Sequence, residues 1–274
     1  MATIKQIKEQ QDAIKSIHKI TRAMELVATA KSQRAIRDLN SYQSYFQKTQ
    51  NIVEKIAKEN VSDQELKGTY WIVLMSDLGL AGSYNSKLIK EIISEVSPTD
   101  KILVIGQKGS ILHSKIANKI EIMPLEVLHD YIGLGDLQVK IQSVYRDDHL
   151  KVKVLFTKFI SQLEFEPKIE QILPIQVDTS QVEEEKKNIV LLEFEPSREI
   201  LLREIEDIYI QSVVQGFYRE AQASENTARR TAMENATRNG DDMLRDLNIV
   251  YNRTRQAKIT QEISEIIGGA EALK

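Results

Sequence analysis

Apolar residues recur at steps of three and four through the first 57 residues, a stretch that contains no glycine and no proline. This period is that of an α-helix with one narrow apolar stripe. At 1.5 Å per residue, such a helix would be about 85 Å long. The positions that carry the stripe are Ile4, Ile7, Ile14, Ile17, Ile20, Met24, Val27 and Ala28.

The pattern changes after residue 68, where short apolar runs alternate with helical stretches. The runs "YWIVLMSD" (70–77) and "KILVIG" (101–106) read as buried strands, and residues 84–96 and 110–118 read as helices. After "IEIMPLE" a third helix is expected over residues 136–147. This alternation predicts a parallel α/β sheet, and hence a Rossmann-like α/β domain.

Three strand-like runs then follow in succession, "KVKVLFTKF", "IEQILPIQ" and "NIVLLEFEP". No helix separates them, so they predict an antiparallel addition to the sheet. The charged segment "QVEEEKKN" between the last two is expected to be an exposed loop.

From Pro196 a helical apolar stripe returns and continues to Gly268, about 70 residues or roughly 105 Å of helix. Neither long helix can bury its stripe alone, so we expect them to pair as an antiparallel coiled coil. The fold class is therefore α/β, with a coiled-coil helix at 1–60, an α/β domain at 68–196 and a second coiled-coil helix at 197–274. The second helix should outrun the first by about 13 residues or more. Its end, with isoleucines on several sides, would need a partner.

Composition narrows the classes of partner. The net charge of −3 argues against a general nucleic-acid coat, although residues 1–56 hold ten Lys and Arg against five Asp and Glu. An acidic protein surface would suit that helix. The absence of cysteine excludes disulfides and thiolate chemistry. With no apolar run of about 18 residues and no signal-like start, a peripheral protein on the cytoplasmic side is expected.

No pattern of catalytic residues emerges. The segment "GQKG" (106–109) follows a strand but lacks the spacing of a phosphate-binding loop, so a structural turn is favoured there and in "SDLGLAGSYN" (76–85). The four histidines have no metal-ligand spacing. Carboxylates mostly alternate with lysines along helix faces, as on solvated surfaces. We therefore expect neither a catalytic site nor a metal or cofactor bound by this chain.

Several segments resemble the gamma-subunit family of F-type ATP synthases. They are "IKQIKEQQDAIKSIHKITRAMELVATAKSQRA", "SDLGLAGSYN", "GQKG", "FTKF", "ILPI" and the long closing segment "SENTARRTAMENATRNGDDMLRDLNIVYNRTRQAKITQEISEIIGGAEAL". They occur in the family's order over essentially the whole chain. The two terminal motifs are long and specific, whereas the central ones are shorter.

The resemblance implies a non-catalytic rotor shaft, the central stalk inside a hexamer of three alpha and three beta subunits. ATP or ADP and Mg would be bound by those subunits, and the α/β domain would contact the epsilon subunit and the ring of membrane c subunits. Lys19, Arg22 and Met24 would meet the acidic lever of a beta subunit. Arg255 and Gln256 would hydrogen-bond a beta-subunit loop. An apolar collar of alpha and beta chains would surround Ile259, Ile263, Ile266 and Ile267.

Some positions depart from the family pattern. Leu78 stands where the family usually has arginine and Ala81 where it has cysteine, so this loop cannot form the arginine's charge-assisted contacts. Such a change also fits a gamma-like paralogue that serves an F1-like ATPase coupled to machinery other than proton flow. Two further alternatives are an autonomous α/β enzyme with a coiled-coil arm and a plain coiled-coil scaffold.

Overall fold

The computed structural model describes residues 3–57, 66–162, 164–175 and 198–271. Its internal contacts divide the chain into two compact units. One consists of residues 1–29 with 229–274, and the other of residues 30–228. The two longest helices, α1 (Ile4–Ala57) and α5 (Arg198–Glu271), each contribute to both units. The parts of these helices that pack on the α/β domain therefore belong to the same unit as that domain.

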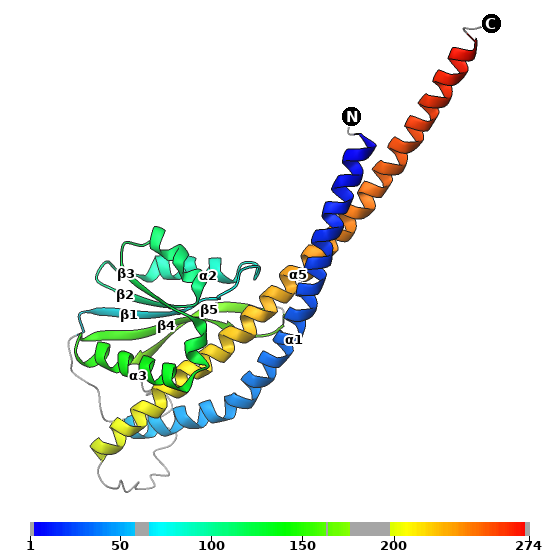
Figure 1. Ribbon diagram of the computed structural model, residues 1–274. Helices are drawn as coiled ribbons and strands as arrows, with labels where there is room; N and C mark the ends of the chain where they lie inside the picture. The colour runs from blue at the N-terminus through cyan, green and yellow to red at the C-terminus, as the bar shows by residue number, and fades with distance from the viewer. Residues whose placement is uncertain (1–2, 58–65, 163, 176–197, 272–274) are drawn as a thin grey trace. The chain divides into compact units, whose positions relative to one another are not determined.

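The second unit is built on one five-stranded sheet with the strand order β3-β2-β1-β4-β5. The first four strands are parallel, and β5 runs antiparallel to β4 (Figure 1). The predicted α/β alternation is thus confirmed. Of the three runs expected to be antiparallel, the second forms the antiparallel strand β5, the first forms β4 and is parallel to β1, and the run at 188–196 lies outside the described residues. The strand bounds are β1 (Gly68–Leu74), β2 (Lys101–Ile105), β3 (Lys119–Met123), β4 (Leu150–Phe159) and β5 (Phe165–Leu173).

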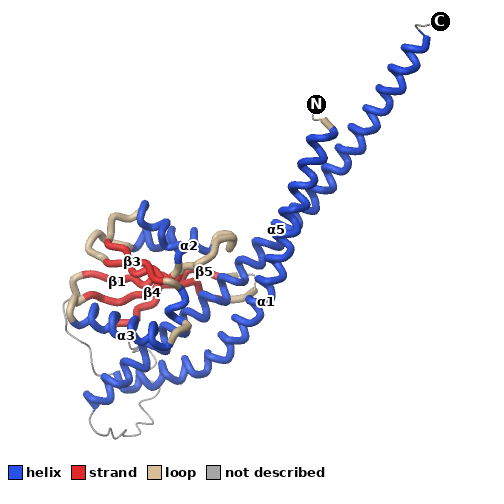
Figure 2. The backbone as a smooth tube through the Cα atoms, in the orientation of Figure 1, coloured by secondary structure: helices blue, strands red, loops and turns tan. Residues whose placement is uncertain are grey.

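Helices cover both faces of the sheet (Figure 2). On one face α2 (Tyr84–Glu95) packs its buried stripe, including Leu88 and Ile92, against Trp71 and Val73 of β1. The other face is covered by α3 (Tyr131–Arg146) and by the first part of α5. Two apolar cores result, one on each side of the sheet, as expected when strands are buried on both faces.

Asp100 anchors the start of the sheet. Its side chain is 6% exposed and accepts hydrogen bonds from the backbone N–H of Thr69 (2.9 Å) and Ser97 (2.9 Å) and from the indole Nε1 of Trp71 (3.0 Å). These bonds join β1 to the turn before β2. A buried carboxylate is tolerated here because several donors surround it.

The helix expected at residues 110–118 is instead a 3₁₀ helix, η1 (Gln107–Ser114). It begins earlier because the backbone approaches the sheet closely at two glycines. Gly106 has a φ of 124°, and a Cβ on Gly109 would lie 2.3 Å from Cγ1 of Val104. A second 3₁₀ helix, η2 (Leu125–Leu128), precedes α3. Both glycines of "GQKG" therefore have a packing role at the start of η1.

Aromatic packing joins α1, α5 and the sheet within the second unit. Phe217 of α5 stacks on Phe156 of β4, with ring centroids 4.2 Å apart, and meets Phe46 of α1 edge to face at 6.0 Å. Gly216 makes this approach possible, because a Cβ there would lie 2.9 Å from the ring of Phe46. Ser32 and Thr227, both buried, place their hydroxyl oxygens 2.9 Å apart.

In the first unit α1 and α5 run antiparallel, and polar pairs mark their interface. Gln11 donates from Nε2 to Oδ1 of Asn248 at 2.9 Å, and His18 places Nε2 2.9 Å from Oδ1 of Asp241. Gln11 and His18 are seven residues apart in α1, and Asp241 and Asn248 are seven residues apart in α5. This offset fixes the register of an antiparallel coiled coil, which the two imperfect heptad patterns alone left open.

Candidate partner-binding surface

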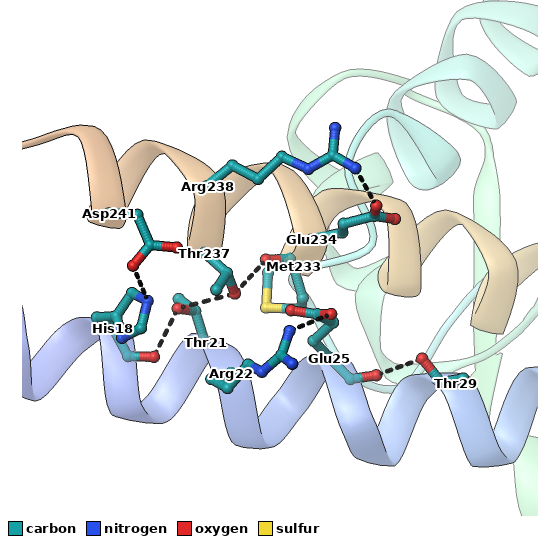
Figure 3. Close-up of polar contacts among 10 residues, drawn as sticks. All are labelled: His18, Thr21, Arg22, Glu25, Thr29, Met233, Glu234, Thr237, Arg238 and Asp241. Carbon is teal, nitrogen blue, oxygen red and sulfur yellow. Dashed lines mark hydrogen bonds and ion pairs between the residues drawn. The ribbon is translucent and has the colours of Figure 1, made fainter.

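The interface of α1 and α5 near His18 is rich in polar contacts (Figure 3). Besides the ion pair that a protonated His18 makes with Asp241, Thr237 donates its hydroxyl to the carbonyl of Met233 at 2.9 Å and lies 3.4 Å from the hydroxyl of Thr21. Thr21 in turn donates to the carbonyl of His18 at 3.0 Å. The two helices therefore meet through short, specific side chains rather than through a continuous apolar stripe.

About one turn further along α1, two acidic residues accept hydrogen bonds from arginines of their own helices. Arg22 donates to Glu25 at 2.8 Å, and Arg238 of α5 donates to Glu234 at 2.5 Å. The Glu25 side chain is only 16% exposed. The guanidinium of Arg22, predicted to meet a partner, is thus already oriented by an acid of its own helix.

The three predicted contact residues of α1 lie close together in the helix. Lys19 and Arg22 are exposed and Met24 is half-buried. Around them the structure exposes apolar side chains that the sequence pattern placed in the buried stripe. These are Ile17 (59% exposed), Ile20 (60%) and Val27 (57%), and Leu26 is equally exposed at 60%. Among the described residues of this unit α1 packs against α5 alone, and one helix covers only part of the apolar surface of α1. The result is a mixed basic and apolar surface.

The six predicted contact residues of α5 lie near its end. α1 begins at Ile4, so the offset set by Gln11 and Asn248 leaves residues 256–271 beyond the first residue of α1, about 24 Å of helix. Residues 255–270 are all exposed. Figure 1 shows this end of α5 continuing past the N-terminal end of α1. The expected projection of the second helix is therefore present.

The isoleucines of this end lie on one side of the helix, not on several sides as the sequence suggested. At about 100° per residue, Arg255, Gln256 and the four isoleucines fall within an arc of about 120°. Asn248 and Asp241, which contact α1, lie on the same side. The least exposed residues of α5 where it meets α1, at 233, 237 and 240, lie roughly 100° away around the helix, so the apolar stripe flanks the face that meets α1. The stripe consists of Ile259 (43% exposed), Ile263 (52%), Ile266 (72%) and Ile267 (58%), with Arg255 and Gln256 at its start.

The opposite side of this end is polar and bonded to itself. Lys258 lies 3.7 Å from Glu262, and Gln261 donates to Glu265 at 2.9 Å. Both pairs join residues four apart, the spacing of neighbours along one helix face. The end of α5 is thus an amphipathic helix with one unoccupied apolar face.

The two predicted sets do not form one site. Thr21, the neighbour of Arg22, contacts Thr237, and Arg255 is 18 residues further along α5, about 27 Å away. Between them an open groove of about 480 Å³ lies across both helices, lined by Ile14 of α1 and by Met243, Leu247 and Val250 of α5. Residues 10–27 and 243–267 of the first unit therefore offer apolar surface to a partner along most of its length.

This surface has the chemistry of protein contact. Among the residues that the structure describes, no three His, Asp or Glu side chains are placed to hold a metal ion. Within the same residues no helix is long and apolar enough to cross a membrane. What the first unit presents is basic, amide and aliphatic groups, which bind another protein by burial and hydrogen bonding.

Comparisons with known proteins agree in family and fold. The family model described as ATP synthase matches residues 3–273. The ATP synthase gamma chain of Mycoplasmopsis pulmonis is 37% identical over 98% of this chain and 99% of its own, and that of Staphylococcus haemolyticus is 32% identical over all of both chains.

Among solved structures, a chain of the Euglena gracilis mitochondrial ATP synthase (OSCP/F1/c-ring) matches 98% of this chain and 94% of its own, with a TM-score of 0.71 at 17% identity. A chain from the central stalk and c-ring of the Tetrahymena thermophila enzyme matches 79% of this chain and 99% of its own, with a TM-score of 0.60 at 23% identity. Because both identities are below 25%, these structural matches show the fold alone.

Proposed function

The chain belongs to the gamma-chain family of ATP synthases, and we propose that its paired helices are the rotor shaft that turns inside a ring of three alpha and three beta subunits. Rotation of this shaft couples ATP synthesis or hydrolysis on the ring to the rest of the complex. The observation that carries the proposal is the end of α5, which projects past α1 with an exposed apolar stripe on one side.

The apolar end of α5 is suited to rotating inside a surrounding ring of subunits. Isoleucines inside an apolar collar gain burial without directional bonds, so the helix can turn without passing through deep energy minima. The polar back of the helix satisfies its charges with its own neighbours, Lys258 with Glu262 among them. Exposed pairs of this kind are worth little. The collar would therefore not be locked to the shaft by long-lived ion pairs.

Arg255 and Gln256 lie at the start of the stripe and give the shaft two polar side chains that can hydrogen-bond a partner. Both are exposed, and we propose that they hydrogen-bond a beta-subunit loop. Lower down, the mixed surface around Lys19, Arg22 and Met24 would meet an acidic beta-subunit segment. A single shaft inside a threefold ring offers a different face to each beta subunit, so each is biased toward a different nucleotide state.

The other assignments follow from membership in the complex. The shaft itself would be non-catalytic, with ATP or ADP and Mg bound by the alpha and beta subunits. Its α/β domain would contact the epsilon subunit and the ring of c subunits. We place the chain peripherally, at the cytoplasmic face of the cell membrane.

The test uses the complex purified through a tag on this chain. Native mass should show three alpha and three beta chains for each copy, with epsilon and c subunits. In that complex the combined change Arg255→Ala and Gln256→Ala should lower the ATPase rate by about fivefold, the equivalent of roughly 1 kcal/mol of lost contact energy. The isolated chain should melt at an unchanged temperature, because both side chains are exposed.

A matched control changes the same residue types on the polar side, Arg253→Ala with Gln261→Ala, and should have the smaller effect. Equal losses from both double variants would remove the assigned role of Arg255 and Gln256. Isolation of the chain without a hexamer would overturn the proposed function.

A further inference from the structure

A row of polar side-chain bonds joins α3 to α5 within the second unit. Arg146 of α3 donates to Glu206 of α5 at 2.8 Å, and Gln142 donates to Asp207 at 2.5 Å. One turn further, Gln138 accepts a hydrogen bond from Gln211. The three α3 residues are four apart, and so are Asp207 and Gln211. Each set thus occupies one helix face, and the two faces meet in antiparallel order. We call these six residues, with the next two of α5, Gln215 and Tyr218, the α3–α5 polar row.

The row continues beyond the start of α3. Gln215, four residues after Gln211, donates from Nε2 to the carbonyl of Leu128 at 2.5 Å. The hydroxyl of Tyr218 is hydrogen-bonded to Nε2 of His129, and the two rings meet edge to face with centroids 5.0 Å apart. Along residues 206–218, α5 is therefore bonded to α3 and to the segment just before it at every turn.

The apolar stripe of α5 lies beside this row. Val213, Val214 and Phe217 are buried against the sheet. Further along the same buried face, Ser224 donates its hydroxyl to the carbonyl of Thr157 in β4 at 3.1 Å. Helix α5 is thus packed on the sheet along its stripe and hydrogen-bonded to α3 and the segment before it along one edge of that stripe.

The two kinds of contact resist different motions. Apolar packing is non-directional and opposes separation more than rolling or sliding of a helix in its groove. Hydrogen bonds weaken steeply when their angle or length changes, so a row of bonds beside the stripe opposes rotation of the helix about its own axis.

We propose that the α3–α5 polar row is the joint through which torque passes between the shaft helix α5 and the α/β domain. This inference rests on the proposed function, since only a shaft under load needs such a joint. A role in folding stability alone explains the Arg146–Glu206 pair of this row poorly. The Arg146 side chain is 48% exposed and that of Glu206 17%, and solvent around the guanidinium limits what this pair adds to folding stability. The directional geometry of the Arg146–Glu206 bond would still resist rotation of α5 when a load is applied.

The test is single-molecule rotation of the assembled complex. The chain has no cysteine, so Ser110→Cys, an exposed position in η1, gives this chain one attachment point for a bead on the α/β domain. Two variants break the joint in different ways. Arg146→Glu sets a glutamate against Glu206, and the pair Gln138→Leu with Gln211→Leu replaces a directed bond by apolar contact. Bulk ATPase without load should stay unchanged in both, because the row contains none of the residues predicted to contact the hexamer.

Under viscous load, the bead rotation of both variants should slow by about fivefold or more, because like charges across a contact repel and apolar contacts lack direction. Adding Glu206→Arg to Arg146→Glu restores an ion pair of reversed polarity and should restore rotation. Thermal melting of each chain checks that the domain stays folded.

Loaded rotation of both variants at the parental rate would overturn the inference, and so would a loss in Arg146→Glu that the reversed pair does not repair. A parental complex that forms the hexamer but never rotates would instead overturn the proposed function, and the joint with it.

Discussion

His18 of α1 and Asp241 of α5 face each other across the helix interface, with Nε2 and Oδ1 2.9 Å apart. Seven residues away on each helix, Gln11 and Asn248 share a hydrogen bond of 2.9 Å. Polar pairs at interface positions cost stability compared with apolar ones but specify the register of a coiled coil. In this shaft the register matters, because it sets how far α5 extends beyond α1.

Replacing Gln11 and Asn248 by leucine should make the pairing stronger and less defined. We expect the melting temperature to stay equal or rise, because an apolar pair avoids the desolvation of two amides. Spin labels on Ser16→Cys and Arg245→Cys should then report a broader distance distribution than in the parent chain. A distribution as narrow as the parental one would show that this pair does not fix the register.

Gly216 and Gly268 both lie inside α5 but should respond to alanine in opposite ways. A Cβ at Gly216 would lie 2.9 Å from the ring of Phe46, whereas nothing lies within 4 Å of one at Gly268. Gly216→Ala should therefore cost about 1–3 kcal/mol of unfolding free energy through overpacking. Gly268→Ala should raise helicity without loss, since alanine favours helix by up to ~1 kcal/mol. Urea unfolding and far-ultraviolet circular dichroism would distinguish the two, and equal costs would contradict the assignment of the clash.

Asp100→Ala should be one of the most damaging single changes in the α/β domain. It removes the acceptor of three hydrogen bonds and leaves the donors of Thr69, Trp71 and Ser97 unpaired. Each buried donor left without a partner costs about 1–3 kcal/mol. Asp136→Ala, at an exposed position of α3, serves as the control and should change the melting temperature little. A similar effect of both changes would mean that water replaces the lost carboxylate.

Glu220 should make folding stability fall as the pH rises. Burial raises the pKa of this carboxyl above its ordinary value of 4.5, although Lys158 and the backbone N–H of Phe159 oppose the shift. The folded state therefore binds its proton more tightly than the unfolded state does. The resulting stabilisation is complete below the ordinary pKa of the carboxyl and is lost as the pH passes through the raised pKa of the folded state.

Glu220→Gln should remove that dependence. The variant should be more stable than the parent at neutral pH. Its unfolding free energy should also change less between pH 4 and 8, a range that begins near the ordinary carboxyl pKa and ends about four units above it. Glu166→Gln, at an exposed position of β5, is the matched control and should leave the profile unchanged. The idea fails if the Glu220 variant keeps the parental slope.

Much of the fold could be predicted from periodicity. The apolar steps of three and four identified α1 and α5, and the buried runs around Trp71 and Leu103 identified β1 and β2 of the sheet. η1 was expected to be an α-helix because the close approach of Gly109 to Val104 depends on tertiary packing, which no local pattern contains. Ile17 and Ile20 were assigned to a buried stripe because periodicity shows that a face is apolar, not what covers it.

The contact surface was predicted less completely. The length of the second helix indicated a projecting end, and the family resemblance indicated which of its residues contact partners. Those contacts remain predictions. The α3–α5 polar row was not foreseen. Gln138, Gln142 and Gln211 look like a solvated helix face in sequence, and only the structure shows that their partners lie on a neighbouring helix.

The seven-residue spacing of the polar pairs between α1 and α5 has a consequence for how this chain can change over evolutionary time. An insertion of one or two residues in either helix would place every later polar side chain opposite the wrong neighbour, His18 and Asp241 included. A whole heptad gained or lost in both helices together would keep all pairs matched. Among descendants of this gene, helix lengths should therefore drift in concert and in steps of seven, while the loops of the α/β domain vary one residue at a time.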